Sequence, residues 1–169
     1  MPDAGPVIRP LTASADAPAV TCLFTAAADY VALESGLAPS AALTDEFFTD
    51  APPGGDPATS LKLGLVLPDG CLAVLADVAF GYPEATDAFI GLMLAATRWR
   101  GRGLGRRMLD HIITTSRARG ATRLLLAVLE ANPRGRAFWQ RHGFREVLRT
   151  PPTVIGLKTH VRIRMARAL

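Results

Sequence analysis

Arginine and glycine alternate over one short segment, Arg100-Gly101-Arg102-Gly103-Leu104-Gly105-Arg106-Arg107. Glycine lets the backbone turn without Cβ clashes, so consecutive N–H groups can point at one place. An apolar pattern of helical period begins at Leu104, and the N-terminus of that helix would add a partial positive charge to the full charges of the arginines. This arginine–glycine loop (residues 100–107) therefore predicts a cradle for a phosphate, and in particular for a diphosphate.

The pattern of these residues differs from those of two common nucleotide-binding loops. No Lys-Ser or Lys-Thr pair follows the last glycine, as a Walker A loop requires. Arg106 stands where the Rossmann fingerprint has its third glycine. A glycine-rich turn before a helix can also serve the fold alone, but the density of arginine favours anion binding over that interpretation.

The histidines and cysteines offer no metal site and no nucleophile. His111, His142 and His160 lack metal-ligand spacing, so we expect no bound metal. Cys22 and Cys71 are too few for a disulfide framework and are expected to be reduced. No Gly-x-Ser-x-Gly elbow or cysteine–histidine motif is present.

Strands and helices alternate around the arginine–glycine loop. A strand at 88–94 precedes it, and a helix at 104–120, a buried strand at 124–129 and a short helix at 133–142 follow. This order predicts an α/β or α+β fold. Other elements are expected as a strand at 7–11, a helix from Asp16 running on to Gly36, a short helix around 43–48, a hairpin of 61–67 with 71–80, and strands near 144–148 and 159–165.

Composition and charge limit the range of partners. Hydrophobic residues make up 49% of the 169 residues and charged residues 20%, which fits one globular domain spanning 1–169. No apolar run approaches the ~20 residues of a membrane span, and the N-terminus lacks the features of a signal peptide. We therefore expect a cytoplasmic protein without a membrane partner.

The charge is divided unevenly along the chain. Twelve acidic and two basic residues precede Arg98, whereas three acidic and seventeen basic residues lie from Arg98 onward. The basic part predicts an anionic partner, unless the arginines only decorate surface helices.

Two motifs in register make the chain resemble the GNAT N-acetyltransferases. The segment Arg100–Gly105 is similar to the (Gln/Arg)-x-x-Gly-x-(Gly/Ala) loop that binds the pyrophosphate of acetyl-CoA in that superfamily. Val128-x-x-x-Asn132 and Phe138-Trp139-x-x-x-Gly143-Phe144 resemble its second conserved block. The resemblance covers the interval 89–148, while residues 1–60 resemble the family only in their expected elements.

The resemblance implies a single-domain mixed sheet of about six to seven strands flanked by helices, with the strands at 89–94 and 124–129 splayed apart. Acetyl-CoA is then the cosubstrate, and its pantetheine arm enters the gap like an added strand. One main-chain N–H of residues 92–94 would polarise the thioester carbonyl. The residues implied for binding acetyl-CoA are Leu92, Met93, Leu94, Arg100, Gly101, Arg102, Gly103, Leu104, Gly105, Arg106, Arg107, Asn132, Phe138 and Trp139.

Trp139 departs from the family pattern. Many GNAT enzymes have a tyrosine here that protonates the leaving thiolate, whereas an indole N–H has no usable acidity. Gly135 likewise stands where the family often has alanine. Tyr82, Tyr30 and water stay open as proton donors, and a thiolate can also leave unprotonated.

The general base is open among several carboxylates. An amine must lose a proton during transfer, and a carboxylate or an ordered water commonly assists. Glu34 is favoured because it lies where the family has its acceptor site, with Tyr30 one helical turn before it. The other candidates are Glu130, Asp77, Glu84 and Asp87. A carboxylate at any of these positions, Glu34 included, is more often a solvated or capping residue than a base.

The resemblance leads us to expect an enzyme that transfers an acetyl group from acetyl-CoA to a primary amine of a small molecule or peptide, by direct attack in a ternary complex. The acidic residues Glu34, Asp45, Glu46 and Asp50 predict a cationic acceptor, unless they only keep two helices soluble. A CoA-binding sensor without catalysis is the alternative that the missing tyrosine favours. Nucleic acid is not expected as a partner, because surface aromatics do not accompany the arginines. A monomer and a homodimer are both compatible with the sequence.

Overall fold

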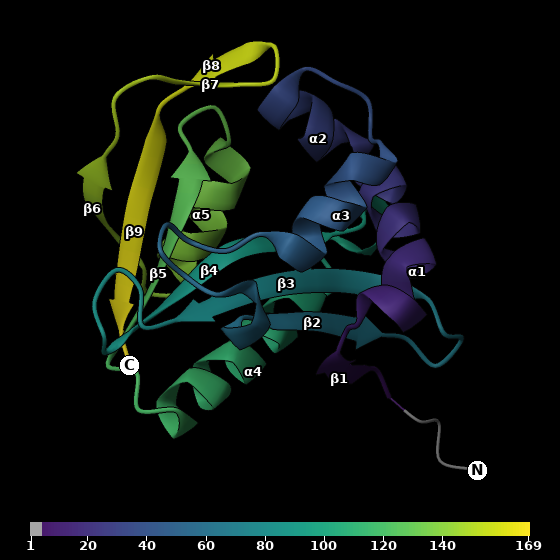
Figure 1. Ribbon diagram of the computed structural model, residues 1–169, viewed down its shortest axis with the longest axis horizontal. Coiled ribbons are helices and arrows are strands. Elements are labelled where there is room, and N and C mark those ends of the chain that lie inside the picture. Colours follow the sequence, from purple (N-terminus) through teal and green to yellow (C-terminus); the bar gives the residue numbers. More distant parts are fainter. Residues whose placement is uncertain (1–4) are drawn as a thin grey trace.

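The protein is described by a computed structural model over residues 5–169, built around one mixed sheet (Figure 1). Residues 1–4 lie outside the described residues. They belong to the domain predicted for residues 1–169 and to the N-terminus that is predicted to lack a signal peptide. Seven strands follow in the order β1-β2-β3-β4-β5-β9-β6, and all neighbours are antiparallel except β4 and β5. This confirms the predicted mixed sheet. The strands, including a separate β7–β8 hairpin, are β1 (Val7–Pro10), β2 (Leu61–Val66), β3 (Leu72–Phe80), β4 (Asp87–Ala95), β5 (Arg123–Leu129), β6 (Arg145–Arg149), β7 (Thr153–Ile155), β8 (Lys158–His160) and β9 (Arg162–Ala168).

Helices cover both faces of the sheet (Figure 1). They are α1 (Ala13–Ala26), α2 (Ala28–Ser35), α3 (Ala41–Thr49), α4 (Leu104–Ala118) and α5 (Pro133–Arg141), with 3-10 turns η1 (Pro57–Thr59) and η2 (Thr97–Trp99). The first three pack on one face around Leu75 and Leu94, and the last two on the other around Met108 and Trp139. Within residues 5–169, no helix combines the length and the apolar character that spanning a bilayer requires.

The first helical segment differs from its prediction. α1 begins about one turn before Asp16, and the Asp16 carboxylate accepts a hydrogen bond from the Thr12 N–H at 2.8 Å. Asp16 is therefore not the first residue of the helix, contrary to the prediction. It lies in the first turn, and its carboxylate caps the N-terminus from there. The expected continuous helix also breaks at Ala27, a fully buried residue with φ −116°, before α2 runs on and ends at Gly36 as predicted.

The end of the chain differs as well. The strand expected at 159–165 is wrong in its bounds, because β9 begins at Arg162 and the β7–β8 hairpin precedes it. Gly156, at φ +58°, turns this hairpin. His160 Nε2 lies 2.8 Å from the carbonyl oxygen of Glu34, so the hairpin rests on the end of α2. The sequence analysis did not predict this hairpin, because contacts between such distant segments leave no local pattern in the sequence.

β4 and β5 pair over only part of their length. Their parallel register ends at Ile90 and Leu126 after four residue pairs. β4 nevertheless continues to Ala95 and β5 to Leu129. The predicted splay of these two strands is confirmed.

A β-bulge in β4 accompanies this separation. In the pairing with β3, Asp77 lies opposite Leu92 and Val78 lies opposite Ile90, which leaves Gly91 as the extra residue. A bulge bends its strand and increases the local twist. β4 therefore turns away from β5 directly after their last pair.

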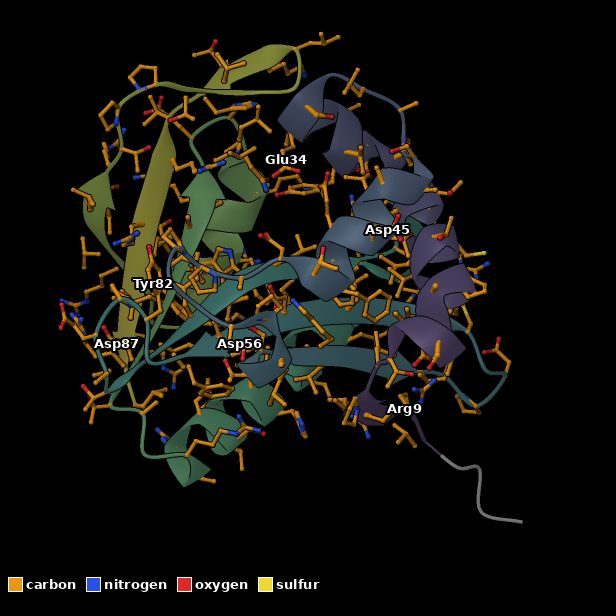
Figure 2. All side chains as sticks on the ribbon, viewed as in Figure 1. Arg9, Glu34, Asp45, Asp56, Tyr82 and Asp87 are labelled. Carbon is orange, nitrogen blue, oxygen red and sulfur yellow. The ribbon has the colours of Figure 1, made fainter. Side chains whose placement is uncertain are left out.

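An ion pair holds the closed end of the two strands. Asp87, labelled in Figure 2, is in register with Arg123, and the Arg123 guanidinium donates to its carboxylate at 2.9 and 2.7 Å. Asp87 is 1% exposed. Hydrogen bonding to Arg123 holds the pKa of this carboxyl below its usual value. The pair thus fixes where β4 and β5 begin to run together.

Asp87→Asn is expected to lower the free energy of unfolding by about 1–3 kcal/mol near neutral pH, because hydrogen bonds to a buried charge are lost. The folded-state pKa is lowered, so this contribution is present above the ordinary Asp pKa of about 3.9 and is lost as the pH falls through the folded-state value. Denaturant unfolding at several pH values measures it. The control is Asp110→Asn, which removes an exposed ion pair with Arg106 and should cost less than about 1 kcal/mol. Equal losses in both variants would contradict the role of Asp87.

Candidate active site

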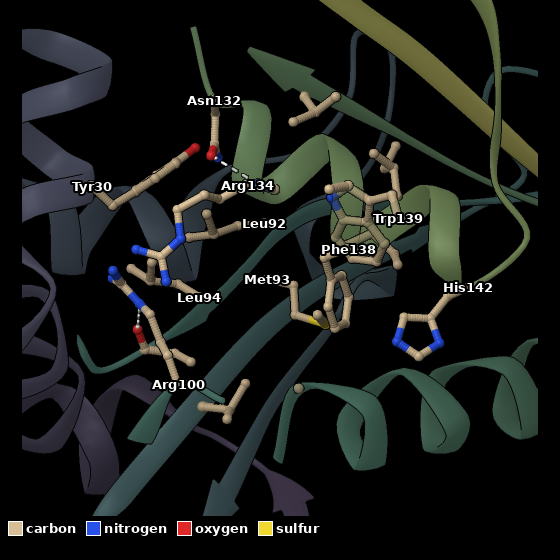
Figure 3. Close-up of a pocket in the computed structure, with 18 of the residues that line it drawn as sticks. Tyr30, Leu92, Met93, Leu94, Arg100, Asn132, Arg134, Phe138, Trp139 and His142 are labelled. Carbon is tan, nitrogen blue, oxygen red and sulfur yellow. Dashed lines mark hydrogen bonds between the residues drawn. The ribbon is translucent and has the colours of Figure 1, made fainter. Parts of the chain in front are cut away.

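The gap between β4 and β5 opens into a cleft of about 690 Å³. Its walls come from the separated strand ends, the start of α4, α5 and Tyr30 of α2 (Figure 3). Of the residues predicted to bind acetyl-CoA, Arg102, Leu104 and Arg107 do not line the cleft. Those that do are Leu92, Met93, Leu94, Arg100, Gly101, Gly103, Gly105, Arg106, Asn132, Phe138 and Trp139.

The edge of β4 that faces β5 borders this cleft. Leu92, Met93 and Leu94 pair with β3 on one side. Within residues 5–169 they have no strand partner on the other side. Free N–H and C=O groups along a strand edge bond to an extended chain laid beside them. An amide-bearing arm can therefore add to β4 as a short strand.

The start of α4 presents backbone donors to one end of the cleft. Its first helical hydrogen bond runs from the Arg107 N–H to the Gly103 carbonyl at 3.0 Å, so the N–H groups of residues 104–106 have no partner within the helix. No side chain of the described residues caps this end. Gly101 and Gly103 take φ values of +73° and +78°, and a Cβ at either would meet open space. Left-handed glycines beside a helix N-terminus form an anion-binding concavity, and these residues fit a diphosphate.

The side chain of Arg100 forms hydrogen bonds within the protein. Its Nε donates to the Ala95 carbonyl at 3.0 Å, and its guanidinium forms two hydrogen bonds with the Asp29 carboxylate of α2. These bonds lower the pKa of Asp29 to about 2. The side chain therefore joins α2 to the end of β4, and its charge is already partnered.

The other loop arginines lie in different places. The Arg102 guanidinium stacks over the Trp99 ring at 5.0 Å, and Arg107 donates to a carbonyl near the N-terminus. Arg106 lines the cleft, 3.7 Å from Asp110 on the next turn of α4. An exposed pair at this distance is weak. Arg106 is thus the loop arginine that is placed to turn toward an anion in the cleft.

Three cleft residues on α5 and at its end were missed by the sequence analysis. Arg134, Arg141 and His142 line the cleft on the helix face that carries Phe138, at spacings of three and four residues. The His142 and Phe138 ring centroids are 4.5 Å apart. Burial, with the nearby Arg106 charge, lowers the pKa of His142. Their spacing of three and four residues from Phe138, which places them on the same helix face, could have predicted them from the sequence.

Asn132 lines the cleft and also caps α5. Its side-chain oxygen accepts a hydrogen bond from the Gly135 N–H at 2.9 Å, which leaves its amide nitrogen for a ligand. A Cβ at Gly135 would lie 2.5 Å from that nitrogen. The glycine that departs from the family pattern therefore keeps the Asn132 cap in place.

Trp139 is a buried wall of the cleft. It is 8% exposed and packs edge-to-face against Phe138 and Phe144, with ring centroids 4.9 and 5.3 Å away. Packing from both sides fixes the indole. It shapes the cleft, and its indole N–H can donate a hydrogen bond but has no usable acidity.

Tyr30 brings a hydroxyl group to the α2 side of the cleft, whereas Glu34, four residues later on α2, does not line it. Tyr30 lines it, with its hydroxyl directed toward the Asn132 side (Figure 3). Burial raises the pKa of both groups, and the Glu34 charge raises that of Tyr30 further. Arg162 and His160 oppose the rise at Glu34. These four residues form a polar cluster where α2 meets the β7–β8 hairpin.

Tyr82 and Glu130 are not brought to the cleft. Tyr82 packs edge-to-face on Phe89 at 5.4 Å, and Glu130 pairs with Arg149 at the surface. Neither lines the cleft, so their predicted catalytic roles lack support from the geometry. Within the described residues, no three His, Cys, Asp or Glu side chains gather as a metal site.

The chain belongs to the GNAT acetyltransferase family. The family model described as "Acetyltransferase (GNAT) family" matches residues 45–144. This interval includes the bulged strand, the arginine–glycine loop, α4, β5 and α5, but not α2. The resemblance of the two sequence motifs is confirmed.

Solved structures and curated relatives agree with this assignment. A crystal structure of an acetyltransferase from Thermus thermophilus matches with a TM-score of 0.79 and 29% identity over 100% of both chains. The ribosomal-protein-S18-alanine N-acetyltransferase from Escherichia coli shares the fold, with a TM-score of 0.69 and 22% identity over 96% of this chain and 93% of that one.

Two curated relatives match over shorter stretches. A mycothiol acetyltransferase from Beutenbergia cavernae is 38% identical over 50% of this chain and 29% of its own length. A 5-NmdU N-acetyltransferase of Pseudomonas phage PaMx11 is 42% identical over 37% of this chain and 40% of its own length. The chain thus matches less than half of either relative.

Gly103→Val is expected to abolish measurable CoA binding while the fold survives, because the side chain would enter the open space of the cradle and strain a left-handed residue. Titration calorimetry with CoA measures the effect. Gly120→Val is a matched control, since Gly120 ends the same helix at φ +82° with equally open space and does not line the cleft. It should bind CoA as the wild type does. Unchanged affinity in Gly103→Val would remove the diphosphate from this loop.

Proposed function

We propose that the protein transfers an acetyl group from acetyl-CoA to a primary amine of a small molecule or peptide in the cytoplasm. The observation that carries this proposal is that a free β4 edge and a bare α4 N-terminus share one cleft. The edge suits the amide-bearing arm of CoA, and the helix end suits its diphosphate. Family membership supports acetyl transfer in general.

Transfer proceeds by direct attack in a ternary complex. The amine nitrogen attacks the thioester carbonyl carbon, the new C–N bond forms, and the C–S bond breaks with its electron pair on sulfur. Negative charge develops on the carbonyl oxygen during this step. A main-chain N–H of residues 92–94 would stabilise that charge by donating to the oxygen.

Tyr30 is suited to donate a hydrogen bond, and not a proton, to the leaving sulfur. Its hydroxyl is in the cleft, and burial raises its pKa above the ordinary value of a phenol. A thiol has an ordinary pKa of about 8.5. Proton transfer from such a phenol to a thiolate is uphill, so the sulfur leaves as a hydrogen-bonded thiolate and takes its proton later.

Negative charge marks the acceptor side. Glu34 lies on α2 with its side chain toward α5, and Asp45 lies on α3 (Figure 2). Glu46 is near enough to raise the pKa of Glu34. Such side chains concentrate an ammonium group and speed its encounter. Relatives named for mycothiol, for 5-NmdU and for the alanine of a ribosomal protein differ in acceptor, so a test needs a broad panel of amines.

Acetyl-CoA turnover with such a panel tests the proposal. The wild type is expected to release CoA only when a suitable amine is present, and mass spectrometry should find that amine heavier by one acetyl group. Tight acetyl-CoA binding with no turnover for any amine would instead favour a CoA-binding sensor, the alternative that Trp139 supports.

Glu34→Gln is expected to raise KM for a cationic amine roughly 3–10-fold, the scale of about 1 kcal/mol, and to leave acetyl-CoA affinity unchanged. Wild-type kcat/KM for cationic amines should fall with rising salt, whereas neutral acceptors should respond little. Glu84→Gln is the control, because Glu84 lies in the β3–β4 turn away from the cleft. A flat salt response, or a preference for neutral amines, would contradict the charge-based recognition.

A further inference from the structure

A buried ion pair lies beneath α3, beside the bulge in β4. Lys62 and Asp77 are cross-strand partners, each 7% exposed, with Nζ 2.8 Å from Asp77 Oδ1. Nζ also donates to the Asp50 carbonyl at 3.0 Å and lies 5.6 Å from the centroid of the Phe47 ring. The lysine is therefore held from several sides, while the carboxylate is bound at one oxygen.

The second oxygen of Asp77 points at the bulge. A Cβ built on Gly91 would lie 2.9 Å from Asp77 Oδ2, so this oxygen occupies the place of a side chain at position 91. Gly91 is exposed and lines the cleft. Among residues 5–169, Lys62 is the only hydrogen-bond partner of the carboxylate, and it bonds Oδ1. Asp77 itself does not line the cleft, but its Oδ2 has no hydrogen-bond partner among the described residues and lies against Gly91, which does.

Asp77 faces the side of the sheet from which the acceptor is proposed to enter. Leu75, two residues earlier on β3, packs in the core beneath α1–α3. Asp77 is in register with Leu92, whose main chain belongs to the free edge. Neighbouring strands lie about 4.8 Å apart. The distance from the Asp77 carboxylate on β3 to a ligand nitrogen at the free edge of β4 is therefore about one strand spacing. The missing side chain of Gly91 leaves the space for the carboxylate.

Stability alone gives little reason for this pair. Replacing a buried ion pair by apolar residues of similar volume is often neutral or stabilising, and the neighbours Leu63 and Ala76 are apolar and buried. Burial raises the pKa of Asp77, Lys62 opposes the rise, and Asp50 adds to it. These are the charged groups that face it. A carboxylate whose pKa is raised above its ordinary value is a better proton acceptor.

We propose that Asp77 accepts the proton of the incoming amine, a role that rests on the proposed acetyl transfer. Oδ2 accepts a hydrogen bond from the ammonium nitrogen and takes one proton, which frees the lone pair for attack on the thioester carbonyl. As the C–N bond forms and the C–S bond breaks, a second proton leaves the nitrogen and reaches the CoA sulfur through solvent. Asp77 then returns its proton to solvent. Lys62 holds the carboxylate toward Gly91, and Glu34 attracts the acceptor farther out.

Asp77→Asn is expected to lower kcat by ~10²–10⁴-fold, the range for losing an acid–base group, with KM for acetyl-CoA unchanged. Wild-type kcat should fall as the pH drops through the raised pKa of Asp77, because the carboxyl then carries a proton. The Asn variant should lack this acidic limb. Glu34→Gln should keep the limb and change KM for the amine.

A double variant separates chemistry from folding. Lys62→Met with Asp77→Leu leaves no unpaired buried charge, so it should fold, bind acetyl-CoA and keep the low kcat of Asp77→Asn. Gly91→Ala, whose methyl group would displace Oδ2, should also lower kcat although it removes no charge.

Two results would overturn the role of Asp77 while leaving acetyl transfer intact. One is an undiminished kcat in Asp77→Asn, and the other is recovery of kcat in the double variant, as a purely structural ion pair predicts. Wild-type protein that acetylates no amine would remove the proposed function itself, and the role of Asp77 with it.

Discussion

Everything at the candidate site depends on the point where β4 stops pairing with β5. A parallel pair that continued past Ile90 would satisfy its own backbone groups and leave no gap. The bulge at Gly91 bends β4 away instead, and one irregular residue thereby opens the cleft, frees a strand edge and gives the Asp77 carboxylate its opening. The same bent strand leads through η2 to the start of α4, so the free edge and the uncapped helix N-terminus belong to one continuous segment.

The opened sheet is held on both sides by contacts between distant segments. Asp87 and Arg123 close it where the pairing begins. At the open end, the bond from Arg100 to Asp29 ties the arginine–glycine loop to α2, and the β7–β8 hairpin rests on α2 through His160. A cleft braced in this way is largely formed before any ligand binds, which reduces the ordering cost of binding.

Local patterns predicted the elements that local forces determine. Glycines at positive φ, the apolar face from Leu104 onward and the order of strands and helices gave the loop, α4 and the splayed pair. The break at Ala27, the β7–β8 hairpin and the partners of Arg100 depend on packing between segments far apart in the chain. Asp77 was one of several candidate bases by residue type, but its place beside Gly91 arises from a register shift that no sequence period encodes. Tyr82 and Glu130 were plausible by type alone, and the fold points them elsewhere.

The central claim is that the free edge of β4 and the N-terminus of α4 bind acetyl-CoA together. Amide hydrogen exchange of the wild-type protein, with and without acetyl-CoA, tests it at both places in one measurement. The account predicts that the ligand slows exchange within residues 91–95 of β4 and 104–106 of α4, because their free N–H groups gain partners. Tight binding that leaves exchange at β4 unchanged, or that slows it only at other elements, would contradict the account.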